Sequence, residues 1–401
     1  MNIIFLTISR IWEIRSRNIY ADLMRKFRDE DHHVYIVTPY ERQFKLQTTL
    51  LKKDGVYILG VRTLNIQKTN VIEKGLGTIL LETQFNNAIK KHLNSVVFDL
   101  ILYSTPPITF TNVVKNLKKK NPQAVSYLLL KDIFPQNAID LGMFSRNSLF
   151  YRYFRKKEIH LYRHSDYIGC MSPANVEFVI RHNTFISQDR VEVAPNSIEL
   201  SPPSSSPDKG KIREKYHLPK NKPVFIYGGN LGKPQGIDFL IQCLEANQER
   251  NDCHFLIVGN GTEYYKIEHW FEKAKPQNMS LFPRLPKEDY DALVQSCDVG
   301  LIFLDHRFLI PNYPSRLLSY LEYKMPIIAA TDVHTDIGSM AENNGYGYWC
   351  ESNKVEDFTA CVNKYVHNPE SIREMGERGY RFLLDNYLVE NTYQKIMSHI
   401  K

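Results

Sequence analysis

Short apolar runs alternate with longer amphipathic segments along the 401-residue chain. Apolar runs of strand length separated by helical patterns are typical of βαβ units and parallel sheets. In the first half we expect helices that include Asn18–Arg28, Val71–Leu93 and Leu149–His164, and strands at Asn2–Thr7, His33–Thr38, Val56–Leu59, Leu100–Tyr103, Val125–Leu130, Tyr167–Met171 and Val191–Ala194. In the second half we expect strands at Val224–Tyr227, His254–Val258, Met279–Phe282, Val299–Leu304 and Ile327–Ala330, and two closing helices from about Pro369.

A segment rich in proline, serine and glycine, SPPSSSPDKGK at Ser201–Lys211, separates the two series. Such a composition cannot build a core and is typical of a linker. The pattern therefore predicts two Rossmann-like, doubly wound α/β domains facing a central cleft, with the linker at 199–211. The first domain covers 1–198 and receives a C-terminal helix at about 385–401, and the second covers 212–384. Ligands of open α/β sheets bind beyond the carboxyl ends of the strands.

Positive charge is concentrated in the first half. The first 200 residues contain 28 Lys and Arg against 18 Asp and Glu, and the remaining residues contain 23 against 26. Basic residues gather at Lys118–Lys120 and at Arg152–Lys157, where aromatic residues are interleaved. This distribution is compatible with solvated helix faces, with anionic lipid head groups or with an anionic acceptor. No nucleic-acid-binding motif accompanies it, so a nucleic-acid partner is not expected.

The cysteine spacing and the hydropathy indicate the compartment. None of the six cysteines has C-x-x-C spacing, which argues against a disulfide framework or a zinc site. The start, MNIIFLTISR, lacks the basic region of a signal peptide, and no apolar run approaches 18 residues. A cytoplasmic protein, peripheral at most on the inner membrane face, is expected.

Turns follow three strands of the second half: the glycine-containing YGGNLGKPQG at Tyr227–Gly236 and VGNG at Val258–Gly261, and FPRLP at Phe282–Pro286, which would present backbone groups to a base. Glycines before a helix let backbone N–H groups approach a phosphate, and Lys233 could add a positive charge. The turns match neither the dinucleotide-binding fingerprint nor a Walker A loop. Each is also an ordinary strand-to-helix turn, but all would converge at one edge of one sheet.

The segment IPNYPSRLLSYLEYKMPII, Ile310–Ile328, predicts a loop, a short helix and a buried strand. Ser315 and Arg316 would stand at the helix start, where unpaired N–H groups suit a phosphate. Glu322 would lie two turns further along, where a carboxylate suits sugar hydroxyls. An amphipathic helix with a polar edge is the plain alternative.

In the first half, polar side chains follow three of the predicted strands. Ser104 begins STPP, and Asp132 lies in KDIFPQ, where it could bind or deprotonate an acceptor hydroxyl or serve as a turn residue. Arg10 and Arg15 lie in the loop SRIWEIRSR and could grip an anionic group. We found no metal-binding loop and no nucleophile motif.

These motifs resemble those of the family 4 retaining glycosyltransferases, which have the GT-B fold. The resemblance extends to the branch of capsule and O-antigen transferases typified by fucosaminyltransferase-like enzymes. That branch has a G-N-x-G-x-x-Q-G loop, a P-S-K/R run, a D-I/L-W/F-P run and, as in the wider family, a P-N-G-like turn. The matching segments are Gly229–Gly236, Pro314–Arg316, Asp132–Pro135 and Pro195–Ser197.

The resemblance implies metal-independent transfer, with retention, of a hexosyl or N-acetylhexosaminyl group from a nucleotide sugar, with a UDP-sugar as the expected donor. No cofactor is implied, and the acceptor would be a glycan or a polyprenyl-diphosphate-linked glycan of surface polysaccharide biosynthesis. It assigns the diphosphate to the loop of Gly229, Asn230 and Gln235 with Ser315, the ribose to Glu322, and the base to Gly259, Asn260, Arg284 and Leu285. Catalysis would depend on Lys233, Arg316 and Asp132, and acceptor contacts on Arg10, Arg15 and Ser104. A UDP-sugar 2-epimerase of the same architecture and a non-catalytic sugar-nucleotide-binding partner remain open alternatives.

Overall fold

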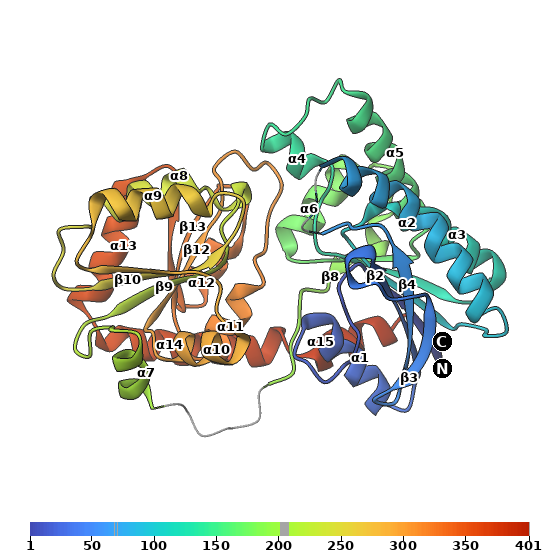
Figure 1. Ribbon diagram of the computed structural model, residues 1–401, viewed down its shortest axis with the longest axis horizontal. Helices are drawn as coiled ribbons and strands as arrows, with labels where there is room; N and C mark the ends of the chain where they lie inside the picture. The colour runs from blue at the N-terminus through green and yellow to red at the C-terminus, as the bar shows by residue number, and fades with distance from the viewer. Residues whose placement is uncertain (68, 70, 201–207, 401) are drawn as a thin grey trace. The chain divides into compact units, whose positions relative to one another are not determined.

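The computed structural model describes residues 1–67, 69, 71–200 and 208–400. The chain divides into two compact units, Met1–Glu199 with Leu388–Lys401, and Leu200–Tyr387. Each unit contains one predominantly parallel sheet with helices on both faces (Figure 1). The predicted α/β class and both doubly wound sheets are therefore confirmed. Of the predicted linker, residues 201–207 lie outside the described residues.

The first unit has an eight-stranded sheet in the order β3-β4-β2-β1-β5-β6-β7-β8. All neighbouring pairs are parallel except β3 with β4. The strands are β1 (Asn2–Leu6), β2 (His33–Glu41), β3 (Thr49–Lys53), β4 (Val56–Thr63), β5 (Leu100–Ser104), β6 (Val125–Leu130), β7 (Tyr167–Cys170) and β8 (Val191–Val193). The helices are α1 (Ile19–Asp29), α2 (Val71–His92), α3 (Thr111–Lys120), α4 (Gln136–Asp140), α5 (Leu149–Arg163), α6 (Pro173–His182) and α15 (Val389–Met397).

The C-terminal helix α15 packs on α1 in the first unit. Tyr393 contacts the ring of Phe27 at 5.0 Å between centroids, and Ile396 is buried in the same core. Lys26 of α1 forms an ion pair of 2.5 Å with Glu390. Aromatic and aliphatic burial of this kind contributes about 1.5–3 kcal/mol per side chain, so α15 is an integral part of this unit.

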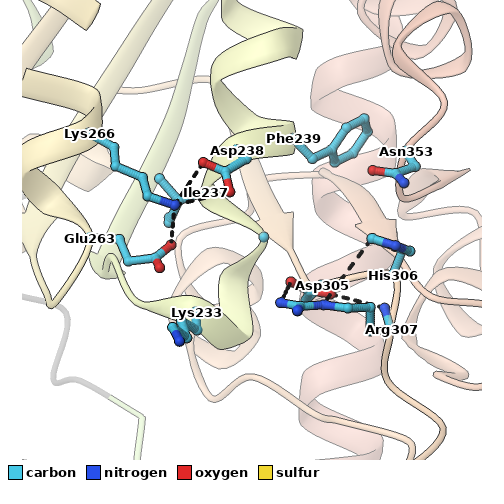
Figure 2. Close-up of a pocket in the computed structure, with 11 residues that line it drawn as sticks. Lys233, Ile237, Asp238, Phe239, Glu263, Lys266, Asp305, His306, Arg307 and Asn353 are labelled. Atoms are coloured by element: carbon cyan, nitrogen blue, oxygen red, sulfur yellow. Dashed lines mark hydrogen bonds and ion pairs between the residues drawn. The ribbon is translucent and has the colours of Figure 1, made fainter. Parts of the chain in front are cut away.

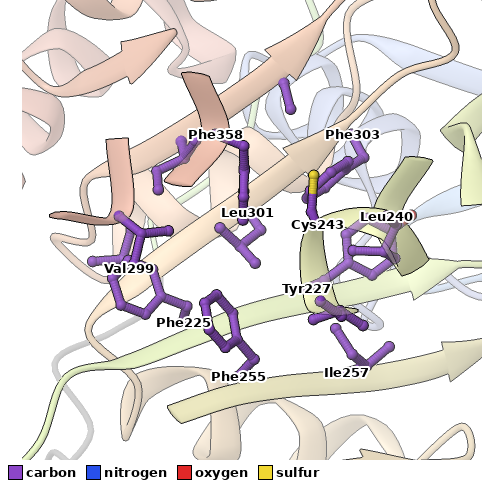
Figure 3. Packing of buried hydrophobic residues seen from close by; sticks show 14 of the residues in the cluster. Phe225, Tyr227, Leu240, Cys243, Phe255, Ile257, Val299, Leu301, Phe303 and Phe358 are labelled. Atoms are coloured by element: carbon purple, nitrogen blue, oxygen red, sulfur yellow. The ribbon is translucent and has the colours of Figure 1, made fainter. Parts of the chain in front are cut away.

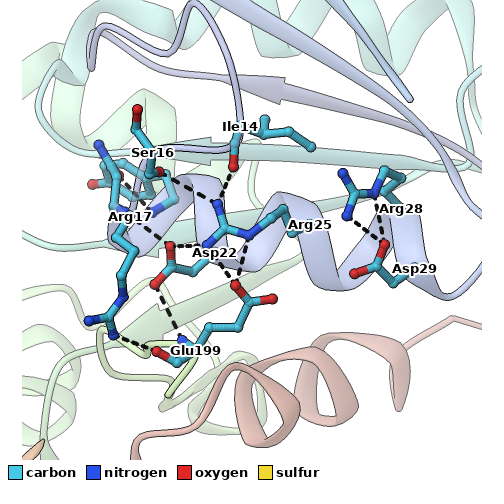
Figure 4. A network of polar contacts seen from close by, with 10 residues as sticks. Ile14, Ser16, Arg17, Asp22, Arg25, Arg28, Asp29 and Glu199 are labelled. Atoms are coloured by element: carbon cyan, nitrogen blue, oxygen red, sulfur yellow. Dashed lines mark hydrogen bonds and ion pairs between the residues drawn. The ribbon is translucent and has the colours of Figure 1, made fainter. Parts of the chain in front are cut away.

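A polar network fastens the end of the first unit to α1 (Figure 4). Arg25 is largely buried, and its guanidinium donates to Asp22 Oδ1 at 2.6 Å and to Glu199 Oε2 at 2.7 Å. Arg17 donates to the Glu199 carbonyl at 2.5 Å. Because a buried charge is costly unless it is paired, this network fixes where the chain leaves the unit.

The second unit has a six-stranded parallel sheet in the order β11-β10-β9-β12-β13-β14. The strands are β9 (Val224–Asn230), β10 (His254–Asn260), β11 (Met279–Phe282), β12 (Val299–Phe303), β13 (Ile327–Thr331) and β14 (Gly347–Glu351). The helices are α7 (Lys209–Lys215), α8 (Ile237–Ala246), α9 (Tyr264–Ala274), α10 (Lys287–Gln295), α11 (Arg316–Glu322), α12 (Ile337–Asn343), α13 (Val355–His367) and α14 (Glu370–Asn386).

The core of the second unit forms between the central strands and helices α8 and α13. Phe225 and Phe255 of neighbouring strands stack at 5.3 Å between ring centroids, and Phe303 contacts Phe358 of α13 at 5.3 Å (Figure 3). These side chains are completely or almost completely buried. The strands read as continuous apolar runs because both sheet faces are covered.

Strand order reverses between β1 and β5 in the first sheet and between β9 and β12 in the second. The crevice at such a switch point is where ligands bind in open α/β sheets. In the second unit, this point brings the loop after β9 close to the loop that connects β12 to α11. No helix among the described residues is long and apolar enough to cross a bilayer.

Candidate active site

A pocket of about 390 Å³ lies at the carboxyl ends of β9, β10 and β11. It contains six residues that the sequence predicts to bind a donor. Three further lining residues, Val258, Lys287 and Tyr290, come from β10 and α10. The predicted residues brought together are Gly229, Asn230, Gly259, Asn260, Arg284 and Leu285.

Two glycines allow the ends of β9 and β10 to approach closely. A Cβ on Gly259 would lie 1.9 Å from the carbonyl oxygen of Gly229, a distance that no side chain permits. Gly229 itself has a φ of +124°, a backbone conformation that favours glycine. The turn therefore presents bare backbone to the pocket, as close approach of an anion to N–H groups requires.

Asn230 and Gln235 order the loop after β9. Asn230 Nδ2 donates to Gln235 Oε1 at 2.8 Å, and the backbone N–H of Gly232 donates to the same oxygen at 3.3 Å. The loop is tied to the next strand because Leu231 N donates to the carbonyl of Asn260 at 2.9 Å. The two amides therefore hold each other and add no charge.

Arg316 supplies a positive charge beside the Gly229 turn. Its guanidinium carbon lies 4.3 Å from the centroid of the Tyr227 ring, and its Nη2 lies 3.5 Å from the Cβ position of Gly229. Nη1 is buried and has no hydrogen-bond partner. Within the described part of the chain, no carboxylate pairs with Arg316. A buried donor without an acceptor lowers stability by about 1–3 kcal/mol, so a bound anion that accepts from Arg316 would be favourable.

Three tyrosines enclose this arginine and support the turn. Tyr320 OH accepts a hydrogen bond from Gly228 N at 3.2 Å and is also 3.2 Å from the carbonyl of Ile226. Tyr290 packs against Gly228, where an added Cβ would lie 2.0 Å from its hydroxyl oxygen. Burial raises the pKa of Tyr290 to about 12, so its hydroxyl stays protonated. Tyr290, Tyr320 and Lys287 were not predicted from the sequence, and only their places on helices beside the glycine turns could have indicated them.

Ser315 and Glu322 bracket α11. Ser315 is exposed and occupies the N-cap position without a side-chain capping bond. Glu322 is the last helical residue and is half-buried. Like Arg316, neither side chain lines the 390 Å³ pocket. Arg316 lies beside Gly229, whereas no contact among the described residues places Ser315 or Glu322 there.

Lys233 is exposed and lines a neighbouring pocket of about 380 Å³ (Figure 2). The other charged groups of this pocket are paired: Lys266 with Asp238 at 2.8 Å, and Arg307 with Asp305 at 2.8 Å. Burial opposes ionisation of Asp305, but the bonds from Arg307 outweigh it and lower the pKa of that carboxyl. Asp305 N donates to the carbonyl of Pro234 at 3.0 Å, so this pocket adjoins the loop after β9.

In the first unit, Asp132 and Ser104 lie at the carboxyl ends of adjacent strands. Thr105 Oγ1 accepts from Asp132 N at 3.2 Å, and Asp132 Oδ1 accepts from Asn137 Nδ2 at 2.8 Å. Burial raises the pKa of Asp132 to about 6, although the bond from Asn137 opposes the shift. A carboxylate with a pKa near neutrality and a defined orientation suits a group that accepts a proton or a hydroxyl hydrogen bond.

The two predicted acceptor-binding arginines are separated. Arg10 donates to the buried carboxylate of Glu41 through Nε at 2.9 Å and Nη2 at 2.6 Å, at the carboxyl end of β2. Arg15 pairs with Asp54 at 2.6 Å, in the turn that precedes β4. Because β4 runs parallel to β2, that turn lies at the opposite edge of the sheet from Ser104 and Asp132. The structure does not bring Arg15 to this edge.

The second unit is similar in sequence to known proteins. Residues 208–382 match the family model described as glycosyl transferases group 1. The chain is 23% identical over 235 residues to the probable glycosyltransferase WbjE of Pseudomonas aeruginosa, covering 56% of each chain. It is 25% identical over 175 residues to the putative colanic acid biosynthesis glycosyl transferase WcaI of Escherichia coli K12, covering 43% of each. The chain thus spans about half the length of the curated relatives it matches.

The structure resembles HepE of Anabaena, solved in complex with UDP, with a TM-score of 0.70 at 15% identity. The match covers 99% of each chain. At this identity the likeness concerns the fold alone. Similar matches to solved glycosyltransferase structures confirm the GT-B fold that the sequence motifs imply. The segment that matches this family model contains the pocket described above, since the lining residues all lie within 208–382.

Proposed function

We propose that the chain is a glycosyltransferase that moves a sugar from a UDP-sugar onto a glycan or lipid-linked glycan, with retention at the anomeric carbon. The main observation that supports this proposal is the environment of Arg316. Its Nη1 has no hydrogen-bond partner, and its charge lies beside the exposed backbone of Gly229. A nucleoside diphosphate supplies the anionic partner that this arginine lacks. HepE, of the same fold, is a UDP complex, which supports UDP as the nucleotide.

Each group would have a defined role in the transfer. The backbone at Gly259 and Leu285 would face the base, and Glu322 the ribose hydroxyls. As the bond between the sugar and the diphosphate breaks, negative charge grows on the leaving oxygen. Arg316 and the N–H groups of the glycine turn would stabilise that charge, and electrostatic stabilisation of this kind commonly lowers an enzymatic barrier more than any other single effect.

Asp132 would accept the hydrogen bond of the attacking acceptor hydroxyl and orient its oxygen. Lys233 would add a second positive charge through the neighbouring pocket. Because Arg316 compensates the diphosphate, we propose that no metal ion is required, and excess EDTA should leave the initial rate unchanged. The relation to WcaI supports an acceptor from surface polysaccharide assembly, such as a capsule or O-antigen intermediate.

The direct test is a transfer assay with a panel of UDP-, GDP- and TDP-sugars and polyprenyl-diphosphate-linked acceptors. We expect UDP release to depend on the presence of acceptor. The sugar in the product should retain the anomeric configuration that it has in the donor. A new UDP-sugar formed without acceptor would instead establish a 2-epimerase. Tight UDP binding with neither transfer nor slow donor hydrolysis would establish a binding protein.

A further inference from the structure

The connection between α4 and α5 exposes an unusual amount of apolar surface. Leu149 and Phe150, adjacent at the start of α5, are 80% and 69% exposed and are the most exposed large hydrophobic side chains among the described residues. Met143 in the preceding loop and Tyr153 one turn later are also exposed. Figure 1 shows this loop and helix at the periphery of the first unit. Exposed apolar residues are normally scattered singly over a protein surface, so a cluster of them indicates an interaction surface.

Positive charges continue the same helix face. Arg152, Lys156 and Arg163 follow Leu149 at helical spacing and are exposed. None of the three forms an ion pair within the described part of the chain. The helix's remaining charges are neutralised, since Arg155 pairs with Glu158 at 2.6 Å and Lys157 with Glu82 at 2.7 Å. The charges on the exposed face are therefore all positive.

The second basic cluster of this unit does not behave in this way. Lys118 pairs with Asp166 at 2.6 Å and also donates to the carbonyl of Ala124 at 2.7 Å. Lys120 donates to the carbonyl of Leu93 at 3.4 Å. These two lysines are thus held by local bonds at the amino-terminal edge of the sheet, and the exposed apolar residue beside them is Val97, which follows the Val96 carbonyl that accepts from Lys120.

Helix α2 extends the apolar surface. The ion pair between Lys157 and Glu82 places α2 beside α5. Both helices return the chain from the carboxyl edge of a parallel sheet, so they run in the same direction. On the amino-terminal side of that ion pair, α2 exposes Leu76, Ile79 and Leu80. Both helices thus carry exposed apolar side chains toward the same edge of the sheet.

We propose that the docking face, formed by Met143, Leu149, Phe150, Arg152, Tyr153 and Lys156 and flanked by the start of α2, binds the surface of an anionic lipid bilayer. The apolar side chains would enter the boundary between head groups and acyl chains, and the cations would contact lipid phosphates. Charge complementarity selects this occupant, because the face combines unpaired cations with apolar residues and has no exposed acidic group between 141 and 164. Docking would place the protein where a lipid-linked acceptor resides, and in that respect the docking face rests on the proposed function.

The test is co-sedimentation of the full chain with vesicles of phosphatidylcholine alone or with 30% phosphatidylglycerol. We expect binding to the anionic vesicles only, weakening steeply with added NaCl. Each cation near an anionic surface is worth a factor of about five in affinity, so Arg152→Gln with Lys156→Gln should cost at least tenfold. Leu149→Ser with Phe150→Ser should cost a similar factor. The matched controls, Lys90→Gln with Lys91→Gln and Val97→Ser, alter exposed residues elsewhere in this unit and should leave binding unchanged.

Several outcomes would overturn the docking face. The proposal would be refuted if the wild-type protein does not bind anionic vesicles, or if the docking-face variants bind them as tightly as the controls do. A concentration-dependent dimer that Leu149→Ser with Phe150→Ser abolishes, without vesicle binding, would make the face a contact between copies. UDP affinity and donor hydrolysis in solution separate this result from a failure of the proposed function, because the docking-face variants should leave both unchanged.

Discussion

Replacing Arg316 with methionine should lower activity strongly and change stability little. The substitution keeps much of the apolar stem but removes the guanidinium that lies over Tyr227 and beside Gly229. Losing one preorganised donor to the leaving diphosphate raises a barrier by roughly 2–4 kcal/mol, about 30- to 1000-fold in kcat/KM. The UDP-sugar transfer rate measures this loss.

The stability of the unliganded protein should not fall in parallel with the activity. The buried Nη1 lacks a partner, so its removal relieves about 1–3 kcal/mol of desolvation cost. The loss of the cation–π contact with Tyr227 lowers stability by about 0.5–2 kcal/mol. The net change therefore lies between about −1 and about +2.5 kcal/mol, which corresponds to a melting point between roughly 4 °C below and roughly 10 °C above that of the wild type.

Arg213→Met is the matched control in the same unit. Arg213 is buried and donates to the Ser296 carbonyl at 2.9 Å, to the Pro219 carbonyl at 2.9 Å and to Asp298 at 2.5 Å. Breaking a buried, fully partnered ion pair costs about 3–5 kcal/mol, so this variant should melt well below the wild type. If Arg316→Met also melts well below the wild type, or if it keeps near-normal turnover, Arg316 is a structural residue and the phosphate assignment is wrong.

Other predictions concern protons and backbone. Since burial raises the pKa of Asp132 to about 6, transfer should fall about tenfold per pH unit below pH 6, whereas UDP affinity in the same buffers should not; a flat rate profile would exclude a role for its ionised form. Burial lowers the pKa of Lys131 to about 7, so the unfolded chain binds more protons between pH 7 and 10.5 and wild-type stability should rise with pH there. Lys131→Met should therefore exceed the wild type in melting point at pH 7 by a margin that shrinks toward pH 10, and a constant margin would contradict this titration. Gly259→Ala, whose Cβ would meet the Gly229 carbonyl at 1.9 Å, should weaken UDP binding at least tenfold, whereas Gly75→Ala on an open helix face should not; equal affinities would refute the close approach.

The alternation of apolar runs was enough to predict most strands, because parallel strands buried on both faces form continuous apolar segments. It missed β3 and β14, which lie at sheet edges. In β3, Thr49–Lys53, most side chains are partly or fully exposed, and its antiparallel pairing with β4 forms a local hairpin. β14 begins with glycine and contains polar and half-buried residues, so its sequence carries no clear strand pattern.

The candidate site was predictable where a local turn determines it. The glycines after β9 and β10 indicated backbone exposure directly, and the structure places both at one pocket. Pairings between distant residues could not be inferred in this way. Arg15 is held by Asp54 and Arg10 by Glu41, and the sequence separation of each pair hides the partner. The cage around Arg316 likewise depends on packing between α11 and β9.

The central claim, that the second unit holds a nucleoside diphosphate through Arg316 and the glycine turn, is tested most directly by calorimetric titration of the whole chain with UDP and with uridine. The account predicts that UDP binds at least 30-fold more tightly than uridine, because a charge-assisted contact to phosphate contributes about 2 kcal/mol or more. Equal affinities for the two ligands, or no binding of UDP, would contradict it.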